Sequence, residues 1–273
     1  MVTERDLTLG DGRTLHVYDS GGDGFTVLWH HGSPQTGRLL APLLEAARQR
    51  GIRLLGYGRP SYGGSTPAPG RTVADAAADV EELADALGVE RFAVMGASGG
   101  GPHALACAAG LPSRVAAVAC FASPAPYSEA FDFYGGMFDP GGLRAAREGR
   151  DARAKHAETA EFDPASFTDA DWAALEGDWA ELGQDAGRAG QAGPDGEIDD
   201  DVAFASPWGF ALDAVQAPAL LAQGGEDRVI PSSHAYELLR ALPRPELWLR
   251  PRDGHVSILH ACPLALDWLL SSR

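Results

Sequence analysis

The sequence predicts an α/β fold in which a mostly parallel sheet is covered by helices on both faces, with a helical segment inserted in the second half. Short apolar runs alternate with segments of helical periodicity over residues 25–121 and again over residues 218–270. Strands that alternate with helices in this way form parallel sheets. The alternation stops between residues 124 and 207, which indicates an insertion. We expect a core of residues 1–123 and 208–273 and a helical cap of residues 124–207.

Composition and charge limit the possible partners. The chain has 273 residues, of which 45% are hydrophobic, which suffices for the core of one α/β domain. A net charge of −16 disfavours nucleic acid and anionic membranes. The first 20 residues carry charges throughout, so we expect no apolar leader, and we expect no membrane-spanning segment because no apolar run is long enough. The three cysteines are predicted to be buried free thiols. We therefore expect a cytoplasmic protein that acts on a small molecule, needs no cofactor or metal, and has an undetermined oligomeric state.

The first elements follow from their periodicity. Residues 3–9 and 13–19 alternate apolar and polar side chains on either side of a Gly-Asp-Gly turn, the pattern of an antiparallel hairpin at the edge of a sheet. Residues 25–31 and 52–57 are short apolar runs typical of buried strands, and we expect a helix to begin near Thr36 between them. Residues 72–87 place apolar side chains at helical spacing.

A glycine-bound serine is the strongest local motif. Residues 92–95 form an apolar strand, Gly96-Ala97-Ser98-Gly99-Gly100 follows directly, and Pro102 suits the first turn of a helix. This strand, G-x-S-x-G and helix sequence is the nucleophile elbow, a turn so tight that only glycine fits two residues before and after the serine. Ser98 is therefore the candidate nucleophile. Residues 115–121 read as the next buried strand.

The insertion is strongly acidic. Residues 126–205 hold 19 Asp and Glu against 6 Lys and Arg, so the cap carries most of the net charge. A negative potential over the site predicts a neutral or cationic substrate, although these charges could equally form a solvated outer face. Spacing predicts one amphipathic helix with Trp172 and Trp179 on its apolar face, which either contact the substrate or only pack the cap on the core. Residues 183–201, rich in glycine and aspartate, predict a mobile loop.

The alternation then resumes and supplies partners for the serine. Strands are expected at residues 218–223 and 246–250, and helices at residues 232–242 and from the loop after the last strand to about Leu270. A serine hydroxyl needs a base, and the base needs a carboxylate to orient it. His255, in a glycine-bearing loop after the last strand, is the candidate base. Asp227 is the candidate acid, with Glu129 or Asp132 as alternatives.

A second loop is expected to complete the site. His31-Gly32-Ser33-Pro34 follows the strand of residues 25–31, and in folds with a serine elbow the corresponding loop donates a backbone N–H to the oxyanion. We expect the two donors to be the N–H groups of Ser33 and Gly99, and His31 to brace this loop.

Taken together these motifs resemble the α/β-hydrolase fold family over nearly the whole chain. The resemblance rests on His31-Gly32-Ser33-Pro34, Gly96-Ala97-Ser98-Gly99-Gly100, Gly225-Glu226-Asp227-Arg228-Val229-Ile230-Pro231 and Asp253-Gly254-His255. Residues 192–210 are similar to a stretch in capped hydrolases of actinobacteria. The resemblance implies an eight-stranded sheet with a helical cap between strands six and seven.

The resemblance leaves several functions open. Haloalkane dehalogenases and epoxide hydrolases have a similar loop but carry aspartate at the elbow, so Ser98 argues against both. A serine hydrolase that cleaves a carboxylic ester or lactone is the first expectation. A proline-iminopeptidase-like aminopeptidase and a cofactor-free haloperoxidase are the enzymatic alternatives. A catalytically silent binding protein of the same fold is the non-enzymatic alternative, although silent members usually lose one of the three residues found here.

Overall fold

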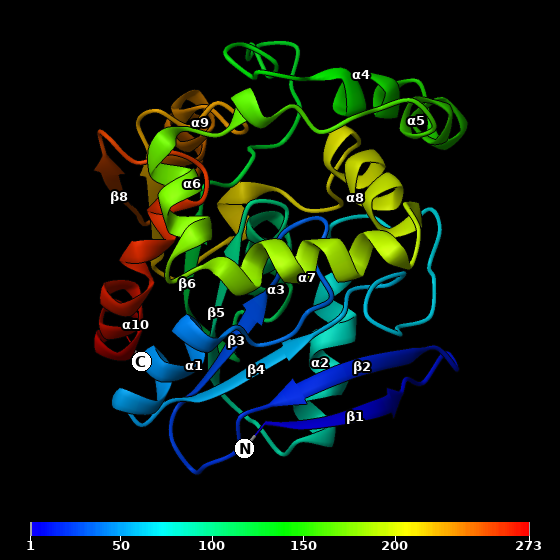
Figure 1. Ribbon diagram of the computed structural model, residues 1–273. Helices are drawn as coiled ribbons and strands as arrows, with labels where there is room; N and C mark the ends of the chain where they lie inside the picture. The colour runs from blue at the N-terminus through cyan, green and yellow to red at the C-terminus, as the bar shows by residue number, and fades with distance from the viewer. Residues whose placement is uncertain (1, 273) are drawn as a thin grey trace.

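The computed structural model describes residues 2–272, and eight strands within them form one sheet in the order β1-β2-β4-β3-β5-β6-β7-β8 (Figure 1). The antiparallel pairs are β1 with β2 and β2 with β4, and the remaining neighbours are parallel. The predicted mostly parallel sheet and its N-terminal hairpin are therefore confirmed. The strands are β1 (Thr3–Thr8), β2 (Thr14–Asp19), β3 (Thr26–His30), β4 (Arg53–Tyr57), β5 (Phe92–Ala97), β6 (Val115–Phe121), β7 (Ala219–Gly224) and β8 (Pro245–Arg250).

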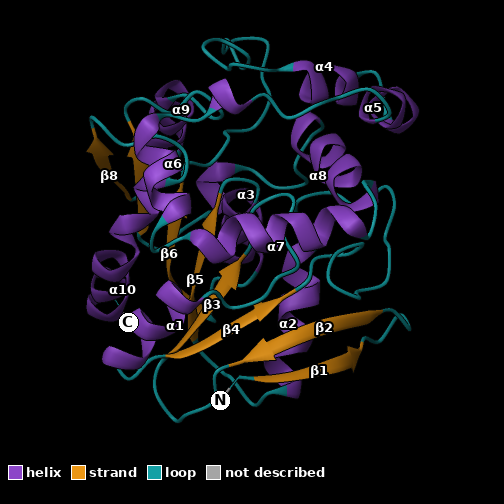
Figure 2. Cartoon of the chain, viewed as in Figure 1, coloured by secondary structure: helices purple, strands orange, loops and turns teal. Residues whose placement is uncertain are grey.

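Helices cover both faces of the sheet, as Figure 2 shows. Successive strand residues point to opposite faces, so Val27 and Trp29 join one buried cluster while Leu28 joins the other. The first cluster includes side chains of α1 and α10, and the second includes side chains of α2, α3 and α9. These helices are α1 (Ala41–Gln49), α2 (Ala76–Ala86), α3 (Gly100–Gly110), α9 (Ser232–Ala241) and α10 (Cys262–Ser271), with short 3₁₀ turns η2 (Leu212–Ala214) and η3 (Ser257–Ala261).

The first helix begins later than the sequence predicts. α1 starts at Ala41 and not near Thr36, because the intervening segment contains Gly37 with φ +91°, a left-handed conformation that does not continue a helix. Pro42 then occupies the first turn of α1, where its missing N–H costs no hydrogen bond. The connection between β3 and α1 is therefore a loop of residues 31–40.

The cap consists of the helices between β6 and β7, and Figure 1 shows it lying above the ends of the central strands. The cap helices are α4 (Gly141–Arg147), α5 (Arg150–Ala157), α6 (Asp169–Glu176), α7 (Ala180–Gln191) and α8 (Asp195–Ala205), with the 3₁₀ turn η1 (Pro164–Ser166). The predicted continuous helix through Trp172 and Trp179 is wrong. Gly177 leaves helical geometry with φ −109° and ψ −123°, so α6 ends and α7 begins again after Trp179.

The prediction of a mobile loop over residues 183–201 is also wrong, because this segment forms most of α7 and the first part of α8. Its three consecutive aspartates lie within α8, and two of them are buried. Arginine side chains balance their charges: Arg59 and Arg71 contact Asp200, Arg150 contacts Asp199, and Arg153 contacts Asp201. In α8, ion pairs with distant residues thus stabilise a helix where the local sequence pattern predicts a loop.

Cys107, Cys120 and Cys262 are free and buried, as predicted. Over residues 2–272 the structure contains no helix that combines the length and apolarity needed to cross a bilayer.

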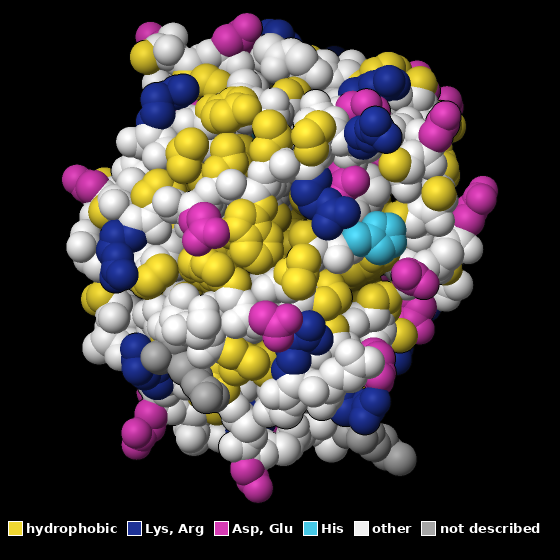
Figure 3. Space-filling model, turned by 90° about the vertical axis from the view of Figure 1, so that its left-hand side faces the viewer, with side chains coloured by type: hydrophobic (Ala, Val, Ile, Leu, Met, Phe, Trp, Pro, Cys, Tyr) yellow, Lys and Arg dark blue, Asp and Glu magenta, His cyan; other side chains and the backbone are white. Residues whose placement is uncertain are grey.

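Figure 3 shows apolar side chains gathered in the middle of one face of the molecule, and large exposed hydrophobic residues include Leu249 on the edge strand β8 and Leu264 on α10.

Candidate active site

Ser98 lies in the sharp turn that joins β5 to α3. Its φ of +51° is a left-handed conformation that non-glycine residues rarely adopt, and its backbone N–H donates to the Phe121 carbonyl oxygen over 2.8 Å. A Cβ added to Gly100 would overlap the backbone carbonyls of His30 and His31 at the end of β3, and one added to Gly96 would overlap the backbone of Gly100. Both glycines of the motif are therefore required for the turn, which leaves Ser98 half-buried above the sheet.

Asp227 and His255 are in direct contact at the same edge of the sheet. Nδ1 of His255 lies 2.9 Å from Oδ2 and 3.2 Å from Oδ1 of Asp227. Oδ1 also accepts the backbone N–H groups of Val229 and Ile230, each over 2.9 Å, which fixes the carboxylate in the loop after β7. Both loops follow the carboxyl ends of parallel strands, as the elbow does, and this is the edge at which sites form in open α/β sheets.

The electrostatics of this pair favour a charged imidazole. Burial of His255 works against the protonated form, but the Asp227 carboxylate outweighs it, so the pKa of His255 is raised above 6.5. A neutral carboxylate-bound imidazole would carry its proton on Nδ1, facing Asp227. The other carboxylates considered from the sequence, Glu129 and Asp132, are exposed in the segment after β6, whereas the side chain of Asp227 is fully buried.

The structure places Ser33 beside Gly99. A Cβ added to Gly99 would lie 2.6 Å from Oγ of Ser33, so the loop after β3 touches the first turn of α3. His31 braces this loop: its Nδ1 donates to the Gly32 carbonyl oxygen over 2.6 Å, and its Nε2 accepts the backbone N–H of Arg59 over 3.1 Å. The pKa of His31 is held well below 6.5 by burial and by the Arg59 charge, so the neutral form that accepts this bond is favoured.

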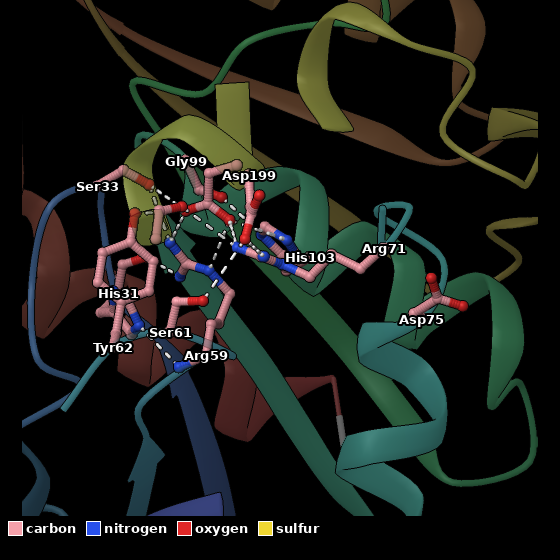
Figure 4. Close-up of polar contacts among 12 residues, drawn as sticks. His31, Ser33, Arg59, Ser61, Tyr62, Arg71, Asp75, Gly99, His103 and Asp199 are labelled. Atoms are coloured by element: carbon pink, nitrogen blue, oxygen red, sulfur yellow. Dashed lines mark hydrogen bonds and ion pairs between the residues drawn. The ribbon is translucent and has the colours of Figure 1, made fainter. Parts of the chain in front are cut away.

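A buried polar network joins the Ser33 loop to the cap (Figure 4). Oγ of Ser33 donates to Oδ2 of Asp200 in α8 over 2.5 Å and accepts from Nη2 of Arg59 over 3.0 Å. Arg59 also contacts Asp200 directly over 2.6 Å, and Tyr62 donates to the same carboxylate over 3.0 Å. The hydroxyl of Ser33 is thus hydrogen-bonded to a cap helix. Removing one partner of a buried ion pair such as Arg59–Asp200 typically lowers the stability of the fold by about 3 to 5 kcal/mol.

Sequence reasoning missed Arg59 and Asp200. The side chain of Arg59 is 1% exposed and that of Asp200 is fully buried, and Arg59 and Arg71 hold the pKa of Asp200 well below its usual range although burial opposes the charge. They stand 141 residues apart in the chain, so no local pattern connects them. The signal that could have indicated them is the run of three aspartates, which the sequence pattern places in a predicted mobile loop.

The two cap tryptophans occupy different environments. Trp179 is 2% exposed and belongs to the buried cluster that includes α1 and α10, so it packs the cap onto the core. Trp172 packs against Phe167, with ring centroids 5.5 Å apart. The Phe167 ring in turn stacks on the His255 imidazole at 6.4 Å with an interplanar angle of 18°. Phe167, which no sequence motif indicates, is therefore an aromatic side chain stacked near the candidate base.

Known proteins match this chain in sequence and in structure. A family model described as "alpha/beta hydrolase fold" matches residues 26–261. A curated relative, "Putative carbamate hydrolase RutD" of Caulobacter sp. (strain K31), is 28% identical over 245 residues, which are 85% of this chain and 84% of the relative.

Solved structures share the fold at lower sequence identity. The bromoperoxidase from Bacillus anthracis superposes with a TM-score of 0.77 at 22% identity, covering 98% of this chain and 100% of that chain. The enol-lactonase from Burkholderia xenovorans LB400 gives a TM-score of 0.73 at 21% identity, with the same coverage of both chains. Identities at this level establish only that the fold is shared.

Proposed function

The chain belongs to the α/β-hydrolase fold family, and we propose that it is a serine hydrolase that cleaves a carboxylic ester or lactone through an acyl-enzyme. The observation that carries the proposal is the 2.9 Å contact between Asp227 and His255 at the sheet edge where Ser98 stands in a strained turn. A nucleophile, a base and an orienting carboxylate held at one edge are the requirements of this chemistry.

In the proposed reaction Oγ of Ser98 attacks the substrate carbonyl carbon while His255 accepts the hydroxyl proton of Ser98. Asp227 holds the imidazole in the required tautomer and stabilises the imidazolium that forms. The backbone N–H groups of Ser33 and Gly99 are proposed to donate to the oxyanion of the tetrahedral intermediate, and one such donor is typically worth about 2.7 to 4 kcal/mol. His255 then gives its proton to the leaving alcohol, and the acyl group stays on Ser98.

Hydrolysis of the acyl-enzyme repeats these roles with water. His255 takes a proton from water while the water oxygen attacks the acyl carbonyl carbon. It gives this proton to Oγ of Ser98 when the bond between Oγ and the acyl group breaks. For a lactone the alcohol and the acid are parts of one molecule, so a single hydroxy acid is released. The polar network beneath Ser33 supports the proposal because it fixes the loop that would carry one oxyanion donor before substrate arrives.

The pH dependence of kcat/KM is expected to report on His255. The base must be neutral, so activity should rise with pH, and its midpoint should lie above pH 6.5 because Asp227 raises the pKa of His255 despite its burial. The same shift stabilises the fold below the unfolded pKa of about 6.5 and is lost as pH rises through the folded pKa. Measurement of kcat/KM for a neutral ester from pH 5 to 9 tests this. A profile that is flat up to pH 8 would contradict a histidine base.

Fewer acidic residues of the cap are free to repel an anionic substrate than the composition indicates. Asp171, Asp185, Asp199 and Asp200 are buried, and arginines balance the last two. Acidic residues such as Asp178 remain exposed. We propose that the substrate is neutral or cationic and partly apolar. Trp172 packs against Phe167, which stacks near His255, whereas Trp179 packs the cap onto the core. The proposed aminopeptidase alternative needs an acidic group free to bind an amine, and the pairing of the buried aspartates weakens it.

A labelling and substrate experiment tests the function. Fluorophosphonate should modify Ser98, as peptide mass spectrometry would show, and a panel of neutral esters, carboxylate-bearing esters and lactones of matched length should show turnover of ester or lactone. Neutral esters should be preferred, with the preference shrinking as salt screens the exposed cap charges. A label on another serine, or turnover of amino-terminal proline peptides alone, would overturn the proposal. Halide-dependent peroxide chemistry without ester turnover would favour the haloperoxidase alternative.

A further inference from the structure

A buried carboxylate of the cap lies against the loop that carries His255. Asp171, in α6, is 1% exposed. Its Oδ1 accepts the backbone N–H groups of Val256 over 2.7 Å and Ser257 over 2.8 Å, together with the Ser257 hydroxyl over 2.9 Å. Its Oδ2 accepts the backbone N–H of His255 over 3.2 Å. Three successive N–H groups of the core thus converge on one carboxylate of the cap, an arrangement that binds anions strongly.

The position of this carboxylate is fixed on the cap side as well. Thr168 donates to Oδ2 of Asp171 from its backbone N–H over 3.0 Å and from its hydroxyl over 2.9 Å, and the hydroxyl accepts the Asp171 N–H over 3.2 Å. This reciprocal pair is the capping box that starts α6. Since every oxygen of Asp171 has defined donors, the carboxylate cannot turn away from the His255 loop without losing hydrogen bonds on both sides.

The glycine before His255 makes this approach possible. A Cβ added to Gly254 would overlap Oδ2 of Asp171 and would lie 2.7 Å from Oγ1 of Thr168. The sequence Asp253-Gly254-His255 therefore needs glycine at its centre for close contact with the cap. The backbone N–H of Gly254 is held separately by the Ser257 hydroxyl over 2.7 Å.

The charge of Asp171 acts on the candidate base. Burial opposes its ionisation, but the donors of the Ser257 and Thr168 backbones outweigh burial and lower its pKa, so the carboxylate stays charged at neutral pH. The charged groups that face His255 are Asp227 from the loop after β7 and Asp171 from the cap; both raise its pKa against the effect of burial. Asp253, two residues before His255, pairs instead with Arg250 over 2.5 Å.

We propose that Asp171 is a positioning residue for His255, which holds the backbone of the base from the cap and stabilises the imidazolium that forms during the reaction. This inference rests on the proposed serine-hydrolase function. It gives the cap a part in the chemistry besides any part in choosing the substrate, because docking of α6 and orientation of the base depend on the same carboxylate.

The test is Asp171→Asn, which keeps the size of the side chain. One amide oxygen can still accept from Val256 and Ser257, but the NH₂ group replaces the acceptor that faces the His255 and Thr168 N–H groups. Loss of hydrogen bonds to a charged group should lower kcat about 10-fold to 100-fold, with KM within about threefold. NMR titration of the histidine rings in the free protein should show a lower pKa for His255 than in the wild type. This readout needs no substrate.

Asp169→Asn is the matched control. Asp169 is exposed and lies two residues before Asp171, at the start of α6, so its replacement removes the same charge from the same helix without touching the His255 loop. We expect wild-type kcat and an unchanged His255 pKa. If Asp171→Asn does not fold, Gly254→Ala displaces the carboxylate while keeping every charge, and should lower both kcat and the His255 pKa.

The outcomes separate this inference from the proposed function. If a folded Asp171→Asn protein matches the wild type in kcat and His255 pKa, Asp171 only packs the cap and the inference is wrong, while fluorophosphonate labelling of Ser98 still supports the hydrolase. A fall in stability and kcat with no change in the His255 pKa would also contradict the inference, because that is the pattern of a purely structural residue. Wild-type protein in which Ser98 takes no label would instead overturn the proposed function.

Discussion

Ser98→Ala is expected to leave a folded protein whose kcat is about 10⁶-fold lower, because no other hydroxyl stands in the elbow turn to form the acyl-enzyme. The substitution keeps a Cβ at the position with φ +51° and removes only the hydroxyl, so the strained turn and the thermal stability should change little. Steady-state kinetics on the best ester, with circular dichroism for the fold, measures both quantities.

Ser271→Ala is the control for this prediction, since Ser271 is exposed at the end of α10, far along the chain from the elbow. It should retain wild-type kcat and full fluorophosphonate labelling. Residual turnover of Ser98→Ala within tenfold of the wild type would show that the reaction does not pass through Ser98.

Asp227→Asn is expected to lower kcat by about 10⁴ while preserving the structure. In the native protein Oδ1 accepts two backbone N–H groups and Oδ2 faces Nδ1 of His255. An amide nitrogen opposite Nδ1 would favour the wrong tautomer of the imidazole and would withdraw the charge that raises the pKa of His255. The pH midpoint of the remaining activity should therefore fall below that of the wild type.

The control is Glu226→Gln, which neutralises the exposed neighbouring carboxylate and should change kcat by less than about twofold. Near-normal activity of Asp227→Asn would transfer the orienting role to another carboxylate. The candidates from the sequence are Glu129 and Asp132, so combining Asp227→Asn with Glu129→Gln or with Asp132→Asn would then show which of them supplies it, because that double variant should lose the activity that the single variant keeps.

The sequence by itself determined the order and nature of most core elements. Apolar runs such as residues 115–121, which form β6 as predicted, and the alternating hairpin of β1 and β2 carry their structure in local periodicity. The strand, glycine-bound serine and helix around Ser98 also form a local pattern, in which Gly96 is crowded by the nearby Gly100 backbone, whereas Gly100 itself is crowded by the distant backbone of His30 and His31. Order along the chain also singled out Asp227 and His255 as candidates, and the structure places them in contact, while their catalytic roles stay predictions.

The tertiary structure decided what each acidic residue of the cap does. In sequence Asp171, Asp200 and Asp178 are equivalent carboxylates, yet the first accepts N–H groups from the His255 loop, the second pairs with Arg59 beneath Ser33, and the third is exposed. Such contacts join residues 84 and 141 positions apart, so neither periodicity nor composition records them. The helix formed by α8 in place of the predicted loop has the same origin, because buried ion pairs with distant arginines outweigh the local preference of glycine and aspartate for turns.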